Sequence, residues 1–277
     1  MKTVVFGGHG FVGNALAVEL EMQGQKVLRV GRQDFDFCNR AAFIEFDQLV
    51  KSEDKVVLAA AKAPAKNFED FVQNVLIIEN LARYLTKARP LYILNISSDA
   101  VYSDSSEHLV EDSFKAPHNP HGLMHCFREA LLNQSFSSNI GHLRPTLIYG
   151  SDDPHEGYGP NLFLRLAREK QDLRIFGNGE ELRDHIHVGD VATIGAAMLN
   201  QKYVGDLNAV TGTLISFKQI ADMVVKYSKE EINIVKQERS APMPHGGYRP
   251  FDNKKLVDFL PEISFKTLEE FIIETLS

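Results

Sequence analysis

The chain has little cysteine, no excess of positive charge and no long hydrophobic run. Cys38 and Cys126 are its two cysteines, and neither stands in a CxxC or other metal-ligand spacing, so we expect a reducing compartment and no metal centre. The net charge of -7 argues against nucleic acid as the main partner. No apolar run approaches the ~20 residues that span a bilayer, and we find no signal-peptide pattern. These absences predict a cytoplasmic protein with no membrane partner.

Residues 2–30 have the pattern of a strand, a glycine turn, a helix and a second strand. Gly7 permits a tight turn out of the strand, Gly10 leaves room for a pyrophosphate, and Gly13 allows the helix to pack closely on the strand. The helix N-terminus then presents free N–H groups to the phosphates. This context favours dinucleotide binding over a purely structural turn. We expect cofactor contacts from Gly7, Gly10, Phe11, Val12 and Gly13.

The end of the second strand bears on the choice between NAD and NADP. An NAD site usually has Asp or Glu there, to bind the ribose 2′-hydroxyl. Here Gly31 occupies the position and Arg32 follows, which suits a 2′-phosphate. We therefore favour NADP, with NAD as the alternative, and Asp36 as a further cofactor contact. Arg32 as an ordinary surface residue is the competing interpretation.

Alternating strands and helices continue along the chain and predict an α/β fold, a Rossmann-like doubly wound parallel sheet with a small C-terminal substrate cap. Strands are expected at 55–61, 90–97 and 141–149, and helices at 40–51, 68–85 and 267–276. Ala59 and Ala60 are small enough for a cofactor to lie across a strand end, and Asn74 is a further candidate. The predicted domains are 1–150 with 184–212 returning to it, and a cap made of 151–183 and 213–277.

Several segments in order along the chain resemble the extended short-chain dehydrogenase/reductases of the NAD-dependent epimerase/dehydratase family. They are the GxxGxxG turn, Ser97–Tyr102, Leu143–Gly150, Gly177–Ala192 and Tyr248–Asp252. The resemblance implies an NAD(P)-dependent enzyme that acts on a nucleotide-linked sugar, with Pro145 beside the nicotinamide. Residues 31–37 and the short chain look most like 4-keto reductases such as dTDP-4-dehydrorhamnose reductase. Residues 183–190 look more like epimerases and dehydratases, so the reaction stays open.

The catalytic position departs from the family. A Tyr and a Lys four residues later are expected after the serine motif, and here the matching residues are His121 and His125. Ser98 keeps the family's role of polarising the sugar oxygen. His121 suits proton transfer near neutral pH, because the ordinary pKa of histidine is about 6.5. His125 is a poorer ribose contact than Lys, since its charge is not assured.

These substitutions leave several interpretations open. The protein is an enzyme with His121 as its acid/base, or a degenerate homologue that binds cofactor or sugar nucleotide as a sensor or partner. Proton transfer through Tyr102 or Cys126 is a third alternative. A zinc site formed by His121, His125 and Glu129 is the last, although the inherited Tyr–Lys spacing already explains the two histidines.

Arg183 and Arg249 match the positions at which the family binds the substrate diphosphate. Forked hydrogen bonds from two arginines suit that group, and surface salt bridges are the competing interpretation. Asn161 is a weaker candidate for the same site. His187 is expected to stabilise the connection from a strand to a helix, and His9 and His245 are expected to be ordinary. Members of the family often form homodimers through two long helices, here 68–85 and 123–136. The His and Arg residues of the second helix leave dimerisation open.

Overall fold

The computed structural model describes residues 1–34, 36–45, 48–154 and 157–277, and its chain divides into two units. The first unit comprises Met1–Ser103, Glu111–Pro145 and Val191–Ala209. The second comprises Asp104–Val110, Thr146–Asp190 and Val210–Ser277. The main differences from the expected domains are the short segment Asp104–Val110, which belongs to the second unit, and the return to the first unit at Val191 instead of residue 184.

The first unit is built on a six-stranded sheet in the order β2-β1-β3-β4-β5-β9, in which every neighbouring pair is parallel. The strands are β1 (Thr3–Phe6), β2 (Val27–Val30), β3 (Lys55–Leu58), β4 (Tyr92–Ile96), β5 (Ile140–Pro145) and β9 (Gly205–Ala209). The chain runs from β1 to β2 on one side and to β3 on the other, so the strand order reverses at β1 and β3. This confirms the predicted Rossmann-like sheet.

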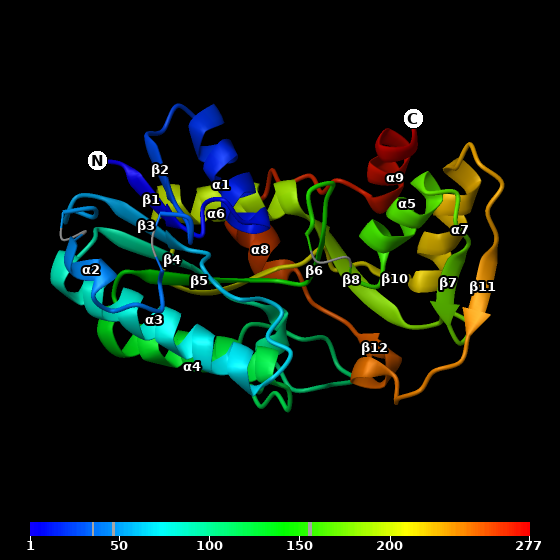
Figure 1. Cartoon of the computed structure of the whole chain (residues 1–277), viewed down its shortest axis with the longest axis horizontal. Helices are drawn as coiled ribbons and strands as arrows, with labels where there is room; N and C mark the ends of the chain where they lie inside the picture. The colour runs from blue at the N-terminus through cyan, green and yellow to red at the C-terminus, as the bar shows by residue number, and fades with distance from the viewer. Residues whose placement is uncertain (35, 46–47, 155–156) are drawn as a thin grey trace. The chain divides into compact units, whose positions relative to one another are not determined.

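Helices cover both faces of this sheet (Figure 1). α1 (Phe11–Met22) and α6 (Val188–Gln201) lie together on one face, where a Cβ on Gly195 would touch Leu16 of α1 and Leu94 of β4. α3 (Phe68–Ala88) and α4 (Pro120–Phe136) lie on the other face, and their apolar sides join the core of the sheet through residues such as Ile78 and Leu132. Because both faces are covered, the strands can be hydrophobic throughout.

Two predicted elements differ in the structure. The helix expected at 40–51 is limited to α2 (Ala42–Glu45), and residues 46–47 of the expected span lie outside the described residues. Further along, Val50 donates its N–H to the Tyr84 hydroxyl, which replaces a helical hydrogen bond. The strand expected at 141–149 is divided at Thr146 into β5 and β6 (Leu147–Tyr149), and β6 pairs with a strand of the second unit.

The second unit contains two small sheets and three helices around an apolar core (Figure 1). In one sheet β8 (Leu182–His187) pairs with β10 (Leu214–Ser216) antiparallel and with β6 and β12 (Tyr248–Arg249) in parallel. The other sheet pairs β7 (Leu173–Phe176) with β11 (Ile234–Gln237). The core helices are α5 (Pro160–Arg168), α7 (Phe217–Tyr227) and α9 (Leu268–Leu276), and a short α8 covers Lys254–Phe259.

Candidate functional site

The glycine turn after β1 has the tight geometry that its sequence predicts. Gly7 has a φ of +87°, and a Cβ there would lie 2.5 Å from the backbone nitrogen of Ala60. A Cβ on Gly13 would lie 2.2 Å from the Gly7 carbonyl oxygen. A Cβ on Gly10 would meet only that same oxygen, at 3.3 Å, and otherwise extends into open space. Two glycines are thus required by close backbone packing, and the third leaves an open cradle.

The N-terminus of α1 fits a phosphate group. Its N-cap residue, Gly10, offers no side-chain cap, and the first turn carries no acidic residue. The positive end of the helix dipole and the first N–H groups, including those of Phe11 and Val12, therefore remain for a ligand anion. This helix follows β1 at the point where the strand order reverses, beside Ala59 and Ala60 at the end of β3. Such a switch point is where parallel α/β sheets bind nucleotides.

The end of β2 holds both a cation and an acid. Arg32 is exposed, as a contact to a 2′-phosphate requires. Asp34, which the sequence analysis missed, accepts a hydrogen bond from the Gly31 N–H at 2.6 Å, and its carboxylate lies 3.8 Å from His9 Nε2 in the glycine turn. Asp36 is also exposed and accepts a hydrogen bond from the Cys38 N–H. Asp34 lies beyond the usual strand-end position, so position alone did not reveal it.

Asn74 and Pro145 lie at the carboxyl edge of the sheet, Asn74 through its bonds to the segment after β3 and Pro145 as the last residue of β5. The Asn74 amide accepts from Lys62 N at 2.9 Å and donates to the carbonyl oxygens of Lys62 and Asp70. Asn74 thus fixes the segment that follows β3 from its place on α3. Pro145 ends β5 and is paired with Ala209 at the carboxyl edge of the sheet. Both residues shape the edge at which a cofactor would lie.

The residues at the start of α4 place His121 beside the serine motif. Asn119 caps α4 by accepting from the Gly122 N–H, and Pro120 occupies the first turn. A Cβ on Gly122 would lie 2.3 Å from the carbonyl oxygen of Ala100, so only glycine lets α4 pack this closely on the 3-10 helix Asp99–Val101. Ser98 caps that helix, with its Oγ accepting from Ala100 N at 3.1 Å. The glycine therefore brings the His121 turn against the Ser98 segment.

His121 and His125 are stacked edge to face, with ring centroids 4.8 Å apart. His125 is buried, and its Nδ1 has no hydrogen-bond partner among the described residues. Burial, together with electrostatic repulsion of the charged form by His121 and Arg128, holds the pKa of His125 well below its ordinary value. His125 is therefore neutral at pH 7 and does not supply the charge that a lysine would bring.

Arg128 carries the buried positive charge of α4 and was missed by the sequence analysis. Its guanidinium donates to Asn95 Oδ1 at 2.5 Å, to the Ala60 carbonyl at 2.9 Å and to the Leu58 carbonyl at 2.7 Å. Burial lowers its pKa to about 10, so it stays charged at neutral pH. Arg128 thus ties α4 to the carboxyl ends of β3 and β4, beside the proposed cofactor edge.

The Glu129 carboxylate is already fully used, which weakens the zinc alternative. It accepts hydrogen bonds from Ser97 Oγ at 2.6 Å and from Arg144 at 2.8 Å, and Lys115 Nζ lies 3.1 Å away. Burial favours a raised pKa, but the hydrogen bonds and charge of Arg144 outweigh it and hold the pKa of Glu129 at about 2. In the described part of the chain, no group of three or more metal-ligating side chains is present.

Tyr102 and Cys126 are poorly suited to proton transfer. Tyr102 is 2% exposed; its hydroxyl donates to Asn208 Oδ1 at 2.7 Å and accepts from Arg144 at 2.8 Å. Burial raises the pKa of Tyr102 well above its ordinary value. The Cys126 thiol points to the Val101 carbonyl, and burial raises its pKa as well. The alternative that used these two residues is therefore unsupported by their surroundings.

In the second unit, Arg183 of β8 and Arg249 of β12 are directly paired in register. Neighbouring residues on parallel strands face the same side of a sheet, so the two guanidinium groups start from one face. Arg183 donates to Glu181 at 2.5 Å and to the Pro244 carbonyl at 2.6 Å. Arg249 donates to Asp104 Oδ1 at 3.2 Å, and both arginines are buried. The structure thus brings together the two arginines that the sequence singled out.

Asn161, the weaker substrate candidate, lies in the first turn of α5. Its amide accepts from Gly150 N at 3.2 Å and donates to Asp153 at 2.6 Å. These bonds hold the segment that precedes the helix, and they give Asn161 a positioning role within the second unit.

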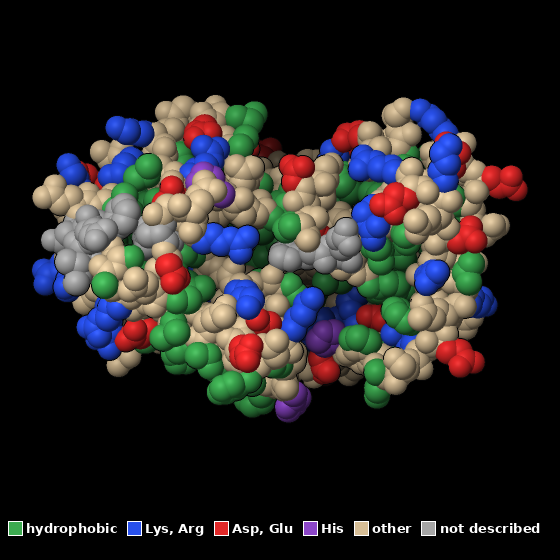
Figure 2. All heavy atoms as spheres, viewed as in Figure 1, with side chains coloured by type: hydrophobic (Ala, Val, Ile, Leu, Met, Phe, Trp, Pro, Cys, Tyr) green, Lys and Arg blue, Asp and Glu red, His purple; other side chains and the backbone are tan. Residues whose placement is uncertain are grey.

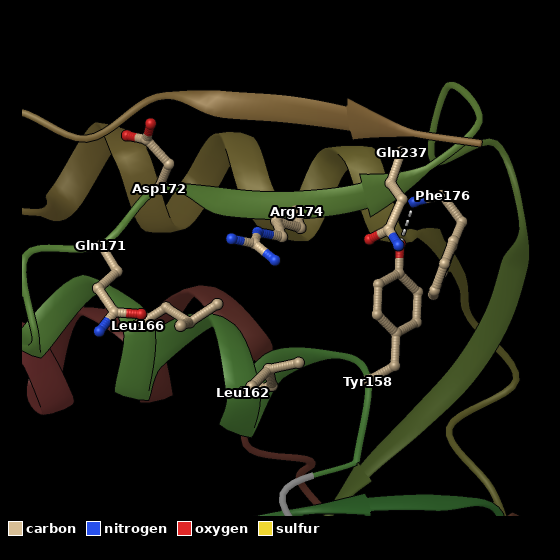
Figure 3. A pocket seen from close by; sticks show the side chains of 8 residues that line it. All are labelled: Tyr158, Leu162, Leu166, Gln171, Asp172, Arg174, Phe176 and Gln237. Atoms are coloured by element: carbon tan, nitrogen blue, oxygen red, sulfur yellow. Dashed lines mark hydrogen bonds between the residues drawn. The ribbon is translucent and has the colours of Figure 1, made fainter. Parts of the chain in front are cut away.

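A cavity of about 650 Å³ in the second unit was not expected from the sequence (Figure 3). It lies between α5 and β7, with Arg174 pointing into it. Its lining residues are Tyr158, Leu162, Leu166, Gln171, Asp172, Arg174, Phe176 and Gln237. Two aromatic rings, two leucines and several polar ends at the rim suit a planar ligand with hydrogen-bonding edges.

Arg239 connects this cavity to the arginine pair. Its guanidinium lies 5.6 Å from the centre of the Phe176 ring and 2.8 Å from the second oxygen of Glu181, which also holds Arg183. Sequence analysis missed Arg239, which belongs to no recognisable motif, and Glu181, which lies within the segment Gly177–Ala192 but was not singled out there. Arg239 therefore contacts both a residue that lines the cavity and the glutamate that holds Arg183.

Comparison with known families agrees with this geometry. A model of the NAD dependent epimerase/dehydratase family matches residues 3–210. The chain belongs to this family. The match confirms the family resemblance, and its range includes the glycine turn and the segments Ser97–Tyr102, Leu143–Gly150 and Gly177–Ala192.

Solved structures share the fold at low sequence identity. UDP-glucose 4-epimerase from Thermus thermophilus, in complex with NAD, matches with a TM-score of 0.82 and 21% identity, covering 100% of this chain and 98% of that one. RMD from Pseudomonas aeruginosa, complexed with NADPH, gives 0.83 and 19%, covering 100% and 98%. UDP-N-acetylglucosamine 4-epimerase from Methanobrevibacter ruminantium gives 0.82 and 19%, covering 99% and 96%.

None of the helices in the described ranges combines the length and the apolar character that crossing a bilayer requires.

Proposed function

We propose that this member of the epimerase/dehydratase family binds NADP or NAD and acts on a nucleotide-linked sugar. The observation that carries the proposal is the glycine turn at the uncapped N-terminus of α1, where the strand order reverses. Neighbours of the same fold include a UDP-glucose 4-epimerase with NAD and a protein with NADPH. Reduction, epimerisation and dehydration remain the candidate reactions.

Calorimetric titration of the purified chain with NADPH and NADH tests cofactor binding. We expect NADPH to bind more tightly, and Arg32→Ala to weaken NADPH about tenfold because a charged hydrogen bond is lost, with NADH unaffected. Asp34→Asn serves as the matched variant, since Asp34 would serve the ribose hydroxyls of NADH. Tighter binding of NADH, weakened in Asp34→Asn, would assign NAD instead. A chain that binds neither would contradict the proposal.

The proposed chemistry assigns each side chain one task. Bound NAD(P) would accept or supply the hydride. Ser98 would donate a hydrogen bond from its hydroxyl to the sugar carbonyl oxygen. His121 would transfer a proton to or from that same oxygen. His125, neutral because it is buried, would contact the ribose through a hydrogen bond without charge. Arg128 would hold the turn of α4 against β3 and β4.

His121→Phe tests this assignment. With a panel of UDP-, GDP- and dTDP-linked sugars, followed by product chromatography, kcat is expected to fall by about 10²–10⁴, the usual contribution of an acid/base residue. NADPH affinity should stay within about twofold. His118→Phe is the matched control, because His118 lies in the loop before α4 and outside the proposed site. Full turnover in His121→Phe would remove His121 from the mechanism.

The substrate would be held in the second unit. Arg183 and Arg249 would bind the diphosphate through forked hydrogen bonds, which their shared register supports. The cavity lined by Tyr158, Arg174 and Phe176 would receive the nucleobase, since the rings offer faces and the arginine offers donors for its edge.

A binding protein without turnover is the second candidate. The observation that favours it is the neutral, buried His125 in place of a charged lysine, which leaves the cofactor ribose without a cation from that position. If NADPH and UDP both bind but no member of the sugar panel is converted, this candidate replaces the enzyme.

We further propose a homodimer through α3 and α4. Hydrophobic side chains gather over these helices in Figure 2. The exposed apolar residues there are Phe68, Val72 and Leu76 of α3, and Leu123 and Phe127 of α4. Their helical spacing gives each helix an apolar stripe that a second copy would cover. Sedimentation equilibrium of the whole chain tests this, and a monomer at micromolar concentration would contradict it.

A further inference from the structure

The ion pairs of the arginine cluster in the second unit are of two kinds. Arg183 pairs with Glu181, and the two side chains are 6% and 7% exposed. Arg249, with a side chain 3% exposed, pairs with Asp104, whose side chain is 62% exposed. Breaking the first pair would leave a buried charge without its partner, which is costly. Releasing Asp104 would return its carboxylate to water, which costs little.

Asp104 reaches the cluster at the head of a short segment that is anchored next to Arg249. Asp104–Val110 belongs to the second unit. Near its end, Leu109 N donates to the Pro250 carbonyl at 2.9 Å and Asp252 N donates to the Leu109 carbonyl at 3.1 Å. The backbone is thus held at Leu109, five residues after the Asp104 carboxylate, which is bonded to the side chains of His245 and Arg249.

His245 completes the contacts of Asp104. Its Nδ1 is hydrogen-bonded to Asp104 Oδ1, the same oxygen that Arg249 approaches. Partial burial alone would raise the pKa of Asp104, but the bond to His245 and the charges of His245, Arg249 and Arg183 hold it below its ordinary value. Asp104 is therefore an anion placed on donors that suit a phosphate equally well.

The charges of the cluster also favour an exchange. Among its described residues, Arg183, Arg239 and Arg249 are positive, and Glu181 and Asp104 are negative. With Asp104 released, the Arg249 guanidinium and the His245 ring would lose this carboxylate as a partner. A diphosphate diester would bring a negative charge on each phosphate to the same donors.

We propose that Asp104 is a displaceable counter-ion, which occupies a phosphate position on Arg249 and His245 until the diphosphate of the substrate replaces it. The inference rests on the proposed function, because it assumes that the arginine pair binds a diphosphate. Asp104 is thereby a residue that sets the affinity of the site, and its removal should strengthen binding.

The test is calorimetric titration of the whole chain with inorganic pyrophosphate and with UDP. Asp104→Asn should lower the Kd of both by about two- to fivefold, because the exposed ion pair no longer competes. Asp258→Asn is the matched control: Asp258 is an exposed acid of the second unit, paired with Lys254, and its loss changes the net charge equally. The control should leave both Kd values unchanged.

Arg249→Ala separates this inference from the proposed function. If Arg249→Ala loses pyrophosphate binding while Asp104→Asn binds no more tightly than wild type, the arginine site stands and the counter-ion is overturned. Equal tightening in Asp104→Asn and Asp258→Asn would also overturn it, since net charge would explain both. Pyrophosphate binding that survives in Arg249→Ala, or that is absent from every variant, would overturn the arginine site together with the inference.

Discussion

One buried arginine in each unit, Arg144 in the first and Arg249 in the second, is paired in a different way. In the first unit, Arg144 is fully buried and bonded to Glu129, to Asp206 and to the Tyr102 hydroxyl, so its donors face protein groups. In the second unit, Arg249 is also buried, but its partner Asp104 is exposed. The first arrangement is closed and fixes α4 on the sheet. The second contains one ion pair that water or a ligand anion can replace, which is what a binding site requires.

Breaking the closed network should have the largest effect. Glu129→Gln leaves Arg144 buried without its carboxylate and should lower the free energy of unfolding by about 3 kcal/mol. Urea unfolding at pH 7 measures this. Glu79→Gln, at an exposed pair with Arg83, is the control and should cost less than about 0.5 kcal/mol. A similar small loss in Glu129→Gln would show that the network is not the stabilising feature described.

The pH dependence of that loss has a definite sign. The pKa of Glu129 is about 2 in the folded protein against an ordinary 4.5, so the ionised carboxylate favours the fold. Its stabilisation is complete above about pH 4.5 and disappears as the pH falls towards 2. Wild type and Glu129→Gln should therefore differ most at neutral pH and converge in acid. A constant difference across this range would contradict the assigned cause.

Replacing the arginine pair of the second unit should weaken substrate binding and leave NADPH affinity nearly unchanged. Arg183→Ala and Arg249→Ala should each weaken UDP binding by about 10- to 100-fold, since each loses a charged hydrogen bond. NADPH affinity should stay within about twofold, because the proposed cofactor site is in the first unit. Arg168→Ala, an exposed arginine at the end of α5, is the control. Equal losses of UDP and NADPH affinity would indicate misfolding.

The smallest effect should come from the outer edge of the closed network. Lys115 is 34% exposed, and its Nζ lies 3.1 Å from both Glu129 and Asp206. Lys115→Met should cost about 0.5–1 kcal/mol, and the cost should shrink at high salt because solvent ions screen the pair. Unfolding at low and high salt checks this. A loss as large as that of Glu129→Gln would place Lys115 inside the network.

The sequence predicts the features that depend on residues close to one another along the chain. Gly7 and Gly13 were predicted at a tight turn, and backbone packing there does exclude a Cβ. The helix expected at 123–136 begins three residues earlier, at Pro120, where Asn119 caps it. The parallel sheet follows from the alternation of apolar strands and helices. Arg183 and Arg249 were found because each lies in a segment that resembles a motif of the family.

The missed residues act through tertiary contacts. Asp104 lies 145 residues before Arg249, and Arg239 lies 58 residues after Glu181, so no local pattern joins either pair. Arg128 looks like a surface residue of α4 until its three buried acceptors are known. The overextended helix at 40–51 has the same origin, because Tyr84 supplies a distant hydrogen bond to Val50.

The register of β12 on β8 makes the arginine pair depend on the number of residues that precede β12. Successive side chains of a strand alternate between faces, so one extra residue just before Tyr248 that shifted the strand against β8 would put Tyr248 opposite Arg183 and turn Arg249 away. The sheet would keep its backbone pairing while the guanidinium pair was lost. An insertion or deletion that shifts β12 can therefore abolish the arginine pair while both arginines are kept.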